Sequence, residues 1–313
     1  MKLIIQIPCL NEAESLPNTL QNLPRHIEGV DQIEILVIDD GSIDKTSEVA
    51  TKHGVQHVVK FPRHRGLARA FKAGLDAALK AGADIIVNTD ADGQYKGEDI
   101  PRLIKPILEK RAEIVIGNRD IEHIRQFSCL KKKLQKVGSG IVRYLSGSNI
   151  PDVTTGFRAY SREAALRLNI ISDYTYTLET IIQAEKSNLA VENIFVTTNE
   201  VKRKSRLFKS IPEYLQKSVV TIIRIYSMFN PLRFFLTIGS IISAIGFLIG
   251  CRFVFYYLLG QGTGKMQSLI LAAALLMIGF QTIVVGLLSD LIAANRRLIE
   301  DILFRVRKIE SKE

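Results

Sequence analysis

The stretch Ile85-Ile86-Val87-Asn88-Thr89-Asp90-Ala91-Asp92-Gly93 decides the fold and also marks a site. Its first five residues form a mostly apolar run that is typical of a buried strand in a parallel sheet. Two carboxylates follow at the carboxyl end of that strand, which is the edge where open α/β sheets bind ligands. Asp90 and Asp92 offer hard oxygen ligands to Mg²⁺ or Mn²⁺, and phosphate oxygens typically complete the shell of such an ion. We therefore expect a metal-assisted diphosphate site, most simply for a nucleotide.

Short apolar runs alternate with helical stretches around this segment. We expect strands at 3–7, 33–38, 56–61, 85–88, 113–116 and 191–196. We expect helices from about Glu12, from Asp44, and over 66–81, 97–110 and 160–187. This βαβα order predicts an α/β domain of the Rossmann-like kind, with a mostly parallel sheet and helices on both faces.

Two long uncharged segments follow the α/β region. One runs from Phe234 to Cys251 over 18 residues, and the other from Met266 to Ser289 over 24 residues. A membrane-spanning helix needs roughly 20 apolar residues. A pair of buried core helices is the alternative, although both runs are apolar on every face. We therefore expect a transmembrane hairpin with helices at about 232–256 and 266–289.

The distribution of charge predicts the orientation of this hairpin. Residues 201–233 carry eight Lys or Arg and one acid, whereas the turn region carries only Arg252 and Lys265. The positive-inside tendency places the large domain and both chain ends in the cytoplasm, in an integral protein of the cytoplasmic membrane. The formal net charge of +10 is concentrated beside the first span, which favours anionic headgroups or phosphate ligands over nucleic acid. The three scattered cysteines fit a reducing compartment.

The sequence thus divides into four parts. We expect a cytoplasmic α/β domain at 1–210, an amphipathic interfacial helix at 211–230, the hairpin at 231–291 and a cytoplasmic C-terminal helix or tail at 292–313. The interfacial helix is predicted from apolar residues at helical spacing, namely Leu215, Val219, Ile222, Tyr226 and Phe229. An ordinary surface helix packed on the domain is the alternative.

Two further strand ends carry polar residues that would reach the same edge. The first strand ends in Pro8-Cys9-Leu10-Asn11-Glu12 and the second in Asp39-Asp40-Gly41-Ser42. A carboxylate there can accept a hydrogen bond from a ribose hydroxyl or a base N–H, and Gly41 allows a tight turn. Each motif alone is also an ordinary turn before a helix. Three such ends in one parallel sheet predict a shared nucleotide crevice.

Together these motifs resemble the nucleotide-sugar motifs of family 2 glycosyltransferases of the GT-A fold. The segments that carry the resemblance are 7–12, 37–42 and 89–94. Ile116-Gly117-Asn118-Arg119 and Asp152-Val153-Thr154-Thr155-Gly156-Phe157-Arg158 resemble the polyprenyl-phosphate branch of that family. This branch includes dolichyl-phosphate mannose synthases and bacterial undecaprenyl-phosphate hexosyltransferases. The resemblance covers residues 1 to about 210, and the two-span tail suits the bacterial members.

The resemblance implies a role for each motif. The donor would meet Pro8, Asn11, Glu12, Asp39, Asp40, Gly41, Asp90, Ala91, Gln94, Arg203 and Lys209. The metal would be held mainly by Asp92, with Asp90 and Gln94. The catalytic groups would be Asp90, Asp92, Arg119 and Asp152, and Asp152 would act as a base or position the sugar. The acceptor phosphate would meet Arg119, Lys133 and Ser139, with Lys133 chosen from the run 131–133 and the donor phosphate as the alternative for Arg119.

The basic loop departs from the family pattern Arg-x-x-Gly-x-Ser-Lys. It reads Arg203-Lys204-Ser205-Arg206-Leu207-Phe208-Lys209, so that Arg206 and Phe208 stand in place of Gly and Ser. The positive charge is kept while the loop's backbone contacts differ, and a plain positive flank of the membrane span is the alternative. Elsewhere, we expect His64 on the surface. Tyr174, Tyr176 and Phe157 are expected in the core rather than at a prenyl chain.

The implied function is inverting, metal-dependent transfer of one hexose from a UDP-hexose or GDP-mannose to a polyprenyl phosphate at the cytoplasmic membrane face. A lipid phosphate is already an anion, so its attack hardly needs a general base, whereas the leaving diphosphate needs a metal and Arg or Lys contacts. A processive polysaccharide synthase is one alternative, but the chain has no Trp for the usual Gln-x-x-Arg-Trp motif. A non-catalytic, membrane-anchored nucleotide-sugar binding protein is the other. Family members with this tail can assemble as homo-oligomers.

Overall fold

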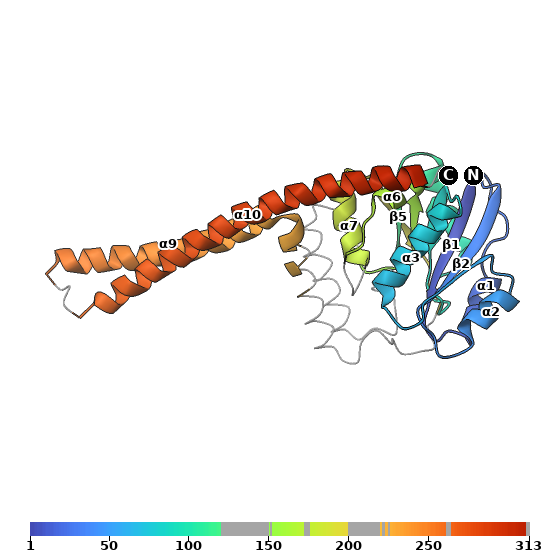
Figure 1. Cartoon of the computed structure of the whole chain (residues 1–313), viewed down its shortest axis with the longest axis horizontal. Coiled ribbons are helices and arrows are strands. Elements are labelled where there is room, and N and C mark those ends of the chain that lie inside the picture. Colours follow the sequence, from blue (N-terminus) through green and yellow to red (C-terminus); the bar gives the residue numbers. More distant parts are fainter. Residues whose placement is uncertain are drawn as a thin grey trace. The chain divides into compact units, whose positions relative to one another are not determined.

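The structure is a computed structural model that describes residues 1–119, 150, 152–171, 176–199, 220, 223–224, 226–260 and 264–310. The chain forms two compact units. One consists of Met1–Ser218 with Asp301–Glu313, and the other of Val219–Glu300. The first unit holds a β-sheet with its covering helices, and the second holds two long helices (Figure 1).

In the described part of the first unit, seven strands form one sheet in the order β3-β2-β1-β4-β6-β5-β7. Their bounds are β1 Lys2–Cys9, β2 Gln32–Asp39, β3 His57–Lys60, β4 Ile85–Asn88, β5 Ile114–Arg119, β6 Arg158–Ser161 and β7 Val191–Val196. All neighbours are parallel, except that β6 runs antiparallel to both β4 and β5. The carboxyl ends of β2, β1 and β4 therefore meet at one edge of the sheet.

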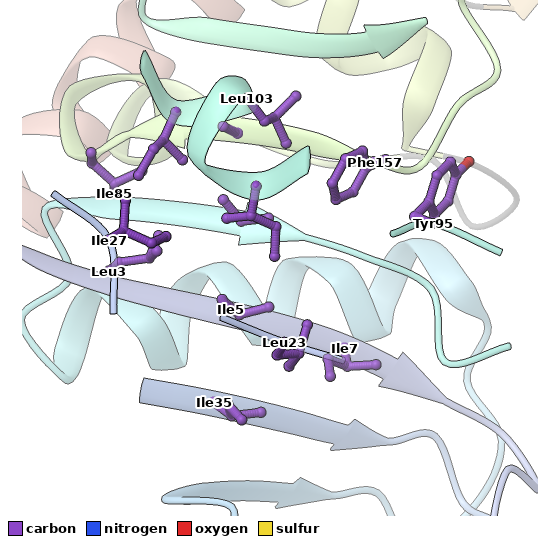
Figure 2. Close-up of a cluster of buried hydrophobic side chains, with 14 of the residues drawn as sticks. Leu3, Ile5, Ile7, Leu23, Ile27, Ile35, Ile85, Tyr95, Leu103 and Phe157 are labelled. Atoms are coloured by element: carbon purple, nitrogen blue, oxygen red, sulfur yellow. The ribbon is translucent and has the colours of Figure 1, made fainter. Parts of the chain in front are cut away.

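Helices cover both faces of this sheet. They are α1 Leu16–Gln21, α2 Thr46–Lys52, α3 Leu67–Lys80, the 3₁₀ turn η1 Gly97–Asp99, α4 Ile100–Leu108, α6 Arg162–Arg167 and α7 Thr177–Lys186. On one face α3 packs against β1 and β2, and on the other face α4 packs against β4, β5 and β6. Figure 2 shows Leu3, Ile5 and Ile7 of β1 in one buried cluster with Leu103 of α4. Because helices cover both faces, a central strand such as β4 is buried at all four positions.

The predicted α/β architecture with a mostly parallel sheet is confirmed. The expected strands at 85–88 and 191–196 are β4 and β7. The expectation of one helix over 160–187 is wrong at its start, because β6 continues to Ser161 before α6 begins, and wrong in its middle, because α6 ends at Arg167 and α7 begins only at Thr177. The Ser161 side chain accepts a hydrogen bond from the amide of Ala164 and so caps that helix. A strand of four residues is too short to show a period of two beside a helical pattern.

The second unit consists of α9 (Pro231–Leu258) and most of α10 (Met266–Glu310). The two helices approach closely at small residues: a Cβ on Gly239 would lie 2.8 Å from the carbonyl oxygen of Gly279, and one on Gly246 would lie 3.1 Å from that of Ala272. Such contacts are typical of packed membrane helices. Both helices are long and apolar enough to cross a membrane. Most of their larger apolar side chains are exposed, which argues against a pair of buried core helices.

Helix α10 is continuous to Glu310, well past the expected end of the second span. Its last turns belong to the first unit, where Arg307 donates to the carbonyl oxygen of Leu168 at 2.9 Å. In the same unit the guanidinium of Arg167 lies 4.4 Å from the centre of the Phe304 ring. The predicted interfacial helix at 211–230 lies largely outside the described residues, although 226–229 are helical.

Gly41 and Gly54 form a matched pair for testing how closely two loops approach. Both have left-handed backbones, with φ of 73° and 75°, so Ala at either position carries a similar strain of about 1 kcal/mol. Only at Gly41 would the new Cβ also overlap backbone, 2.3 Å from the carbonyl carbon of Arg63, whereas nothing lies within 4 Å at Gly54. We expect Gly54→Ala to lower the melting temperature by a few degrees, and Gly41→Ala to lower it far more or to prevent folding. Thermal denaturation of the full chain, followed by circular dichroism, tests this. Equal shifts would show that the loops do not press together.

Candidate active site

The loops after β1 and β2 are tied together at the carboxyl edge of the sheet. The amide of Asp40 donates to the carbonyl oxygen of Cys9 at 2.9 Å. Asn11, which has a φ of 54°, donates its amide to the Ser42 hydroxyl at 2.9 Å, and its side-chain oxygen accepts from the amide of Ile43 at 2.9 Å. These bonds give the first two predicted donor motifs a fixed relation to each other.

Asp39 and Glu12 are both buried at this junction. The Asp39 carboxylate accepts from the amide of Ser42 at 2.8 Å and from the Ser47 hydroxyl, so its orientation is set by the loop itself. The amide of Glu12 donates to the Thr46 hydroxyl at 2.9 Å. The two acids therefore lie buried at the ends of β1 and β2, where the resemblance places the base and ribose.

Asp40 holds a third loop at the same edge. Its carboxylate accepts from the amides of Arg65 at 2.7 Å and Gly66 at 3.0 Å, just before α3 begins. It also pairs with His64 at 2.8 Å, whose side chain is 59 % exposed, as expected for a surface histidine. Asp40 thus shapes the loop between β3 and α3. Its contact with a donor stays a prediction.

The turn after β4 carries Asp90 and Asp92. Asp90 is half-buried, and a Cβ added at Gly156 would lie 3.0 Å from its Oδ1 atom. Burial raises the pKa of Asp90 to about 7, the Asp92 carboxylate adds to this effect, and the charge of Arg119 opposes it. The Oδ1 atom of Asp92 accepts from the amide of Gln94 at 3.0 Å. Two neighbouring carboxylates, one of which has a raised pKa, form a donor set that suits a divalent cation.

Two residues that the sequence did not reveal hold this turn from outside. The Thr19 hydroxyl of α1 donates to the carbonyl oxygen of Ala91 at 2.9 Å. Asn199 donates its side-chain amide to the carbonyl oxygen of Gly93 at 3.0 Å, and its backbone amide to that of Gln94 at 2.9 Å. Asn199 lies 106 residues from Gly93 along the chain, so no local pattern could have found it.

Arg119, at the end of β5, makes a bidentate ion pair with Asp152. Its Nε atom donates to Oδ2 at 2.7 Å and its Nη2 atom to Oδ1 at 3.3 Å, while Nη2 also donates to the Thr154 hydroxyl at 3.0 Å. Burial pushes the pKa of Asp152 upward, but the Arg119 guanidinium outweighs it and holds that pKa below its usual value. Such a carboxylate is a weak base. The lowered pKa does not favour the predicted role of Asp152 as a base, and its predicted role in positioning the sugar stays a prediction.

A polar network lies in the core beside the Asp90 turn. Gln6 of β1 donates its side-chain amide to Asn88 Oδ1 at 2.9 Å. Asn88 in turn donates to the carbonyl oxygen of Gly156 at 2.8 Å and to the Tyr176 hydroxyl at 2.9 Å. The network therefore links β1, β4, the residue that precedes α7 and the loop that precedes β6. Sequence reasoning missed it, because Gln6 and Asn88 stand inside apolar runs.

Two of the three aromatic residues weighed for a prenyl contact are in the core, as expected, and the third, Tyr174, lies outside the described residues. Tyr176 is buried and stacks on Phe71 with ring centres 3.8 Å apart. Phe157 is buried and stacks on Tyr95 at 4.9 Å, and Figure 2 shows these two side by side.

The structure brings most of the predicted site residues to this one edge of the sheet. Four others lie outside the described residues, namely Lys133, Ser139, Arg203 and Lys209. Within the described part of the chain, no group of three or more His, Cys, Asp or Glu side chains is arranged to hold a metal ion. A cation here would therefore take Asp92 and Asp90, with Gln94, and complete its shell from a bound phosphate.

Comparison with known proteins adds a family and a fold. The family model described as glycosyl transferase family 2 matches residues 4–168. An undecaprenyl-phosphate mannosyltransferase from Micrococcus luteus is 30% identical over 232 residues, which cover 72% of this chain and 93% of that protein. An undecaprenyl-phosphate 4-deoxy-4-formamido-L-arabinose transferase from Photorhabdus laumondii is 28% identical, with 98% of this chain and 92% of that protein covered.

A similar solved structure is glucosyl-3-phosphoglycerate synthase from Mycobacterium tuberculosis, in complex with Mn²⁺, UDP-glucose and phosphoglyceric acid. It superposes with a TM-score of 0.57 at 19% identity, covering 72% of this chain and 78% of that one. The likeness confirms the predicted GT-A-like fold.

The raised pKa of Asp90 predicts how stability depends on pH in the metal-free protein. Its folded pKa of about 7 lies above the ordinary value of 3.8, so between these values the folded state binds more protons than the unfolded state. Stability contributed by the protonated carboxyl is therefore lost as pH rises through this window. In EDTA we expect Asp90→Asn to melt roughly 5 °C above the wild type at pH 8, and no higher than the wild type at pH 4. Glu28→Gln, at an exposed carboxylate, should show no such pH-dependent difference. A constant offset for Asp90→Asn at both pH values would contradict the raised pKa.

Proposed function

The chain belongs to glycosyl transferase family 2, and we propose that it moves a single hexose from a nucleotide diphosphate sugar to a polyprenyl phosphate in a membrane. It is a glycosyltransferase, as the sequence motifs predicted. The observation that carries the proposal is the meeting of Asp90, Asp92 and the Arg119–Asp152 pair at one sheet edge.

The donor side of the proposal uses the loops after β1, β2 and β4. Asp39 and Glu12 would accept hydrogen bonds from the base and ribose of a UDP-hexose or GDP-mannose. Asp92, Asp90 and Gln94 would hold Mg²⁺ or Mn²⁺, which when bound neutralises charge on the leaving diphosphate. The fit rests on the repulsion between Asp90 and Asp92, which a cation relieves. Arg203 and Lys209 would add positive charge over the same diphosphate.

The acceptor side uses Arg119. Asp152 orients the guanidinium, and an Arg so held can present two N–H groups to a phosphate. Because a phosphate monoester is already anionic, it can attack the anomeric carbon directly from the face opposite the leaving group, with inversion. The depressed pKa of Asp152 agrees with a reaction that needs no strong base. Lys133 and Ser139 would complete the phosphate site. The names of both relatives describe sugar transferases that use undecaprenyl phosphate, which supports this class of acceptor.

The membrane part of the proposal rests on the two apolar helices. Both are long enough to span a bilayer, and the basic excess at 201–233 favours a cytoplasmic face for the catalytic unit. A lipid-linked acceptor carries its phosphate at headgroup depth, so an enzyme anchored there meets it by diffusion in two dimensions.

A panel of labelled donors tests the reaction. We expect the full chain in nanodiscs, with Mn²⁺ and undecaprenyl phosphate, to turn one UDP-hexose or GDP-mannose into a butanol-soluble product carrying one sugar, and EDTA to abolish this. A growing polymer would identify a processive synthase instead. Saturable donor binding without transfer or hydrolysis of any donor would identify a binding protein.

Asp92→Asn tests the metal-ligand role directly. We expect transfer to fall about 100-fold or more, because the neutral amide no longer holds a cation against the diphosphate. Asp31→Asn is the control, since that side chain is 87% exposed and lies just before β2, at the opposite edge of the sheet. Equal rates for Asp92→Asn and Asp31→Asn in a stopped assay would exclude Asp92 from the reaction.

A further inference from the structure

We infer that Arg158 is a positioning residue that holds the Asp152–Phe157 loop, and through it the Arg119–Asp152 pair, in place for transfer. The inference rests on the proposed function for its activity readout. Arg158 is the first residue of β6, has no exposed surface, and is the largest of the fully buried side chains in the described residues. A buried guanidinium loses its hydration, so its retention calls for strong internal partners.

Arg158 finds these partners in the loop and in the start of α7. Its Nε atom donates to the carbonyl oxygen of Thr155 at 2.9 Å and its Nη2 atom to that of Val153 at 2.9 Å. Its Nη1 atom donates to the carbonyl oxygen of Thr177 at 2.8 Å and to the Thr180 hydroxyl at 2.7 Å. All four acceptors are neutral oxygens. The side chain is therefore placed to shape backbone rather than to compensate an acid.

The backbone of Arg158 lies between the two strands that deliver the charged groups. In register, it pairs with Asn88 of β4 on one side and Ile116 of β5 on the other. Asp90 follows Asn88 by two residues and Arg119 follows Ile116 by three. One residue thus joins the strand of the metal carboxylates, the strand of the phosphate-binding arginine, and the loop between them.

The loop that Arg158 holds carries residues that contact both Arg119 and Asp90. Asp152 directly precedes Val153, whose carbonyl Arg158 holds, and Asp152 orients Arg119. Gly156 follows Thr155 and lies against Asp90. Loss of the hydrogen bonds from the Arg158 guanidinium would let the loop relax and turn Asp152 away from Arg119. Lysine cannot replace it, because a single nitrogen cannot reach three carbonyls in fixed directions.

The other end of β6 provides a matched control. Arg162 follows Ser161 directly and donates from Nη1 to the carbonyl oxygen of Ala83 at 2.8 Å. It makes the same kind of bond, from an arginine to a backbone carbonyl, at the edge of the sheet away from the site.

A double-mutant cycle tests the inference. We expect Arg158→Lys to lower kcat about 100-fold, since small misplacement of reacting groups has effects of this size, and to change KM for the donor less than about 3-fold. Because Arg158 acts through Asp152, Arg158→Lys with Asp152→Asn should be no slower than Asp152→Asn alone, within about 3-fold. Arg162→Ala should lower kcat less than about 3-fold, and in the double variant this loss should multiply with the loss caused by Asp152→Asn. A multiplied loss for the Arg158 pair, or wild-type kcat in folded Arg158→Lys, would overturn the inference.

Hydrogen exchange gives a readout that does not depend on catalysis. We expect amides of 153–157 to exchange at least 10-fold faster in Arg158→Lys, and at the wild-type rate in Arg162→Ala. If Arg158→Lys fails to fold, Thr180→Val removes one acceptor while keeping the charge, and should shift exchange and kcat in the same direction. Unchanged exchange in either Arg158→Lys or Thr180→Val would refute the clamp. If the wild type transfers no sugar to polyprenyl phosphate, the proposed function fails, while the exchange comparison still decides the clamp.

Discussion

The register of β1 between β2 and β4 is the constraint on which the site depends. Cys9 pairs with Asp39, and Gln6 pairs with Asn88, in two parallel ladders. Once these ladders form, the acidic residues that follow each strand have to share one edge of the sheet. Glu12, Asp39 and Asp90 are far apart in the sequence but all follow or end strands at this edge, so the edge is strongly acidic before any ligand binds. Their charges even raise the pKa of the neighbouring Cys9, after the larger effect of its burial.

The surrounding structure balances this charge in two ways. Asp39 and Asp40 take hydrogen bonds from backbone amides and nearby side chains, and thereby become parts of the loops they belong to. Asp152 is neutralised by Arg119. Asp90 differs from Asp152, because the pKa of Asp90 is raised whereas that of Asp152 is lowered. A carboxylate that the fold leaves electrostatically strained is suited to a cation, and this contrast separates the acids that build the crevice from those that would act in it.

The two units share one element. Helix α10 packs against α9 through glycines and alanine in one unit, and its last turns bond to α6 in the other. The small residues allow close backbone contact without relying on a hydrophobic effect that lipid would not supply. The final turns instead use Arg307 and an aromatic contact at Phe304, which are suited to an aqueous surface.

Much of this protein could be predicted from its sequence. The strands expected at 85–88 and 191–196 coincide with β4 and β7, and uncharged segments identified both long helices. The acids at three strand ends predicted a shared site, and the structure places those strand ends at one edge, because parallel strands bring their carboxyl ends together. These features could be predicted because the local pattern of apolar and polar residues indicates which segments are buried.

The tertiary structure alone decided which groups act on which. Strand β6 exists because two neighbours bond to it, and its four residues have no period of their own. Asn199 reaches the Asp92 turn across the sheet, and Asp152 is oriented by an arginine 33 residues away. Arg158 would be read as an exposed charge, yet it is buried among carbonyls. A sequence pattern indicates which segments will be buried. The hydrogen-bond partner of a buried polar group is decided by long-range packing, which the pattern does not show.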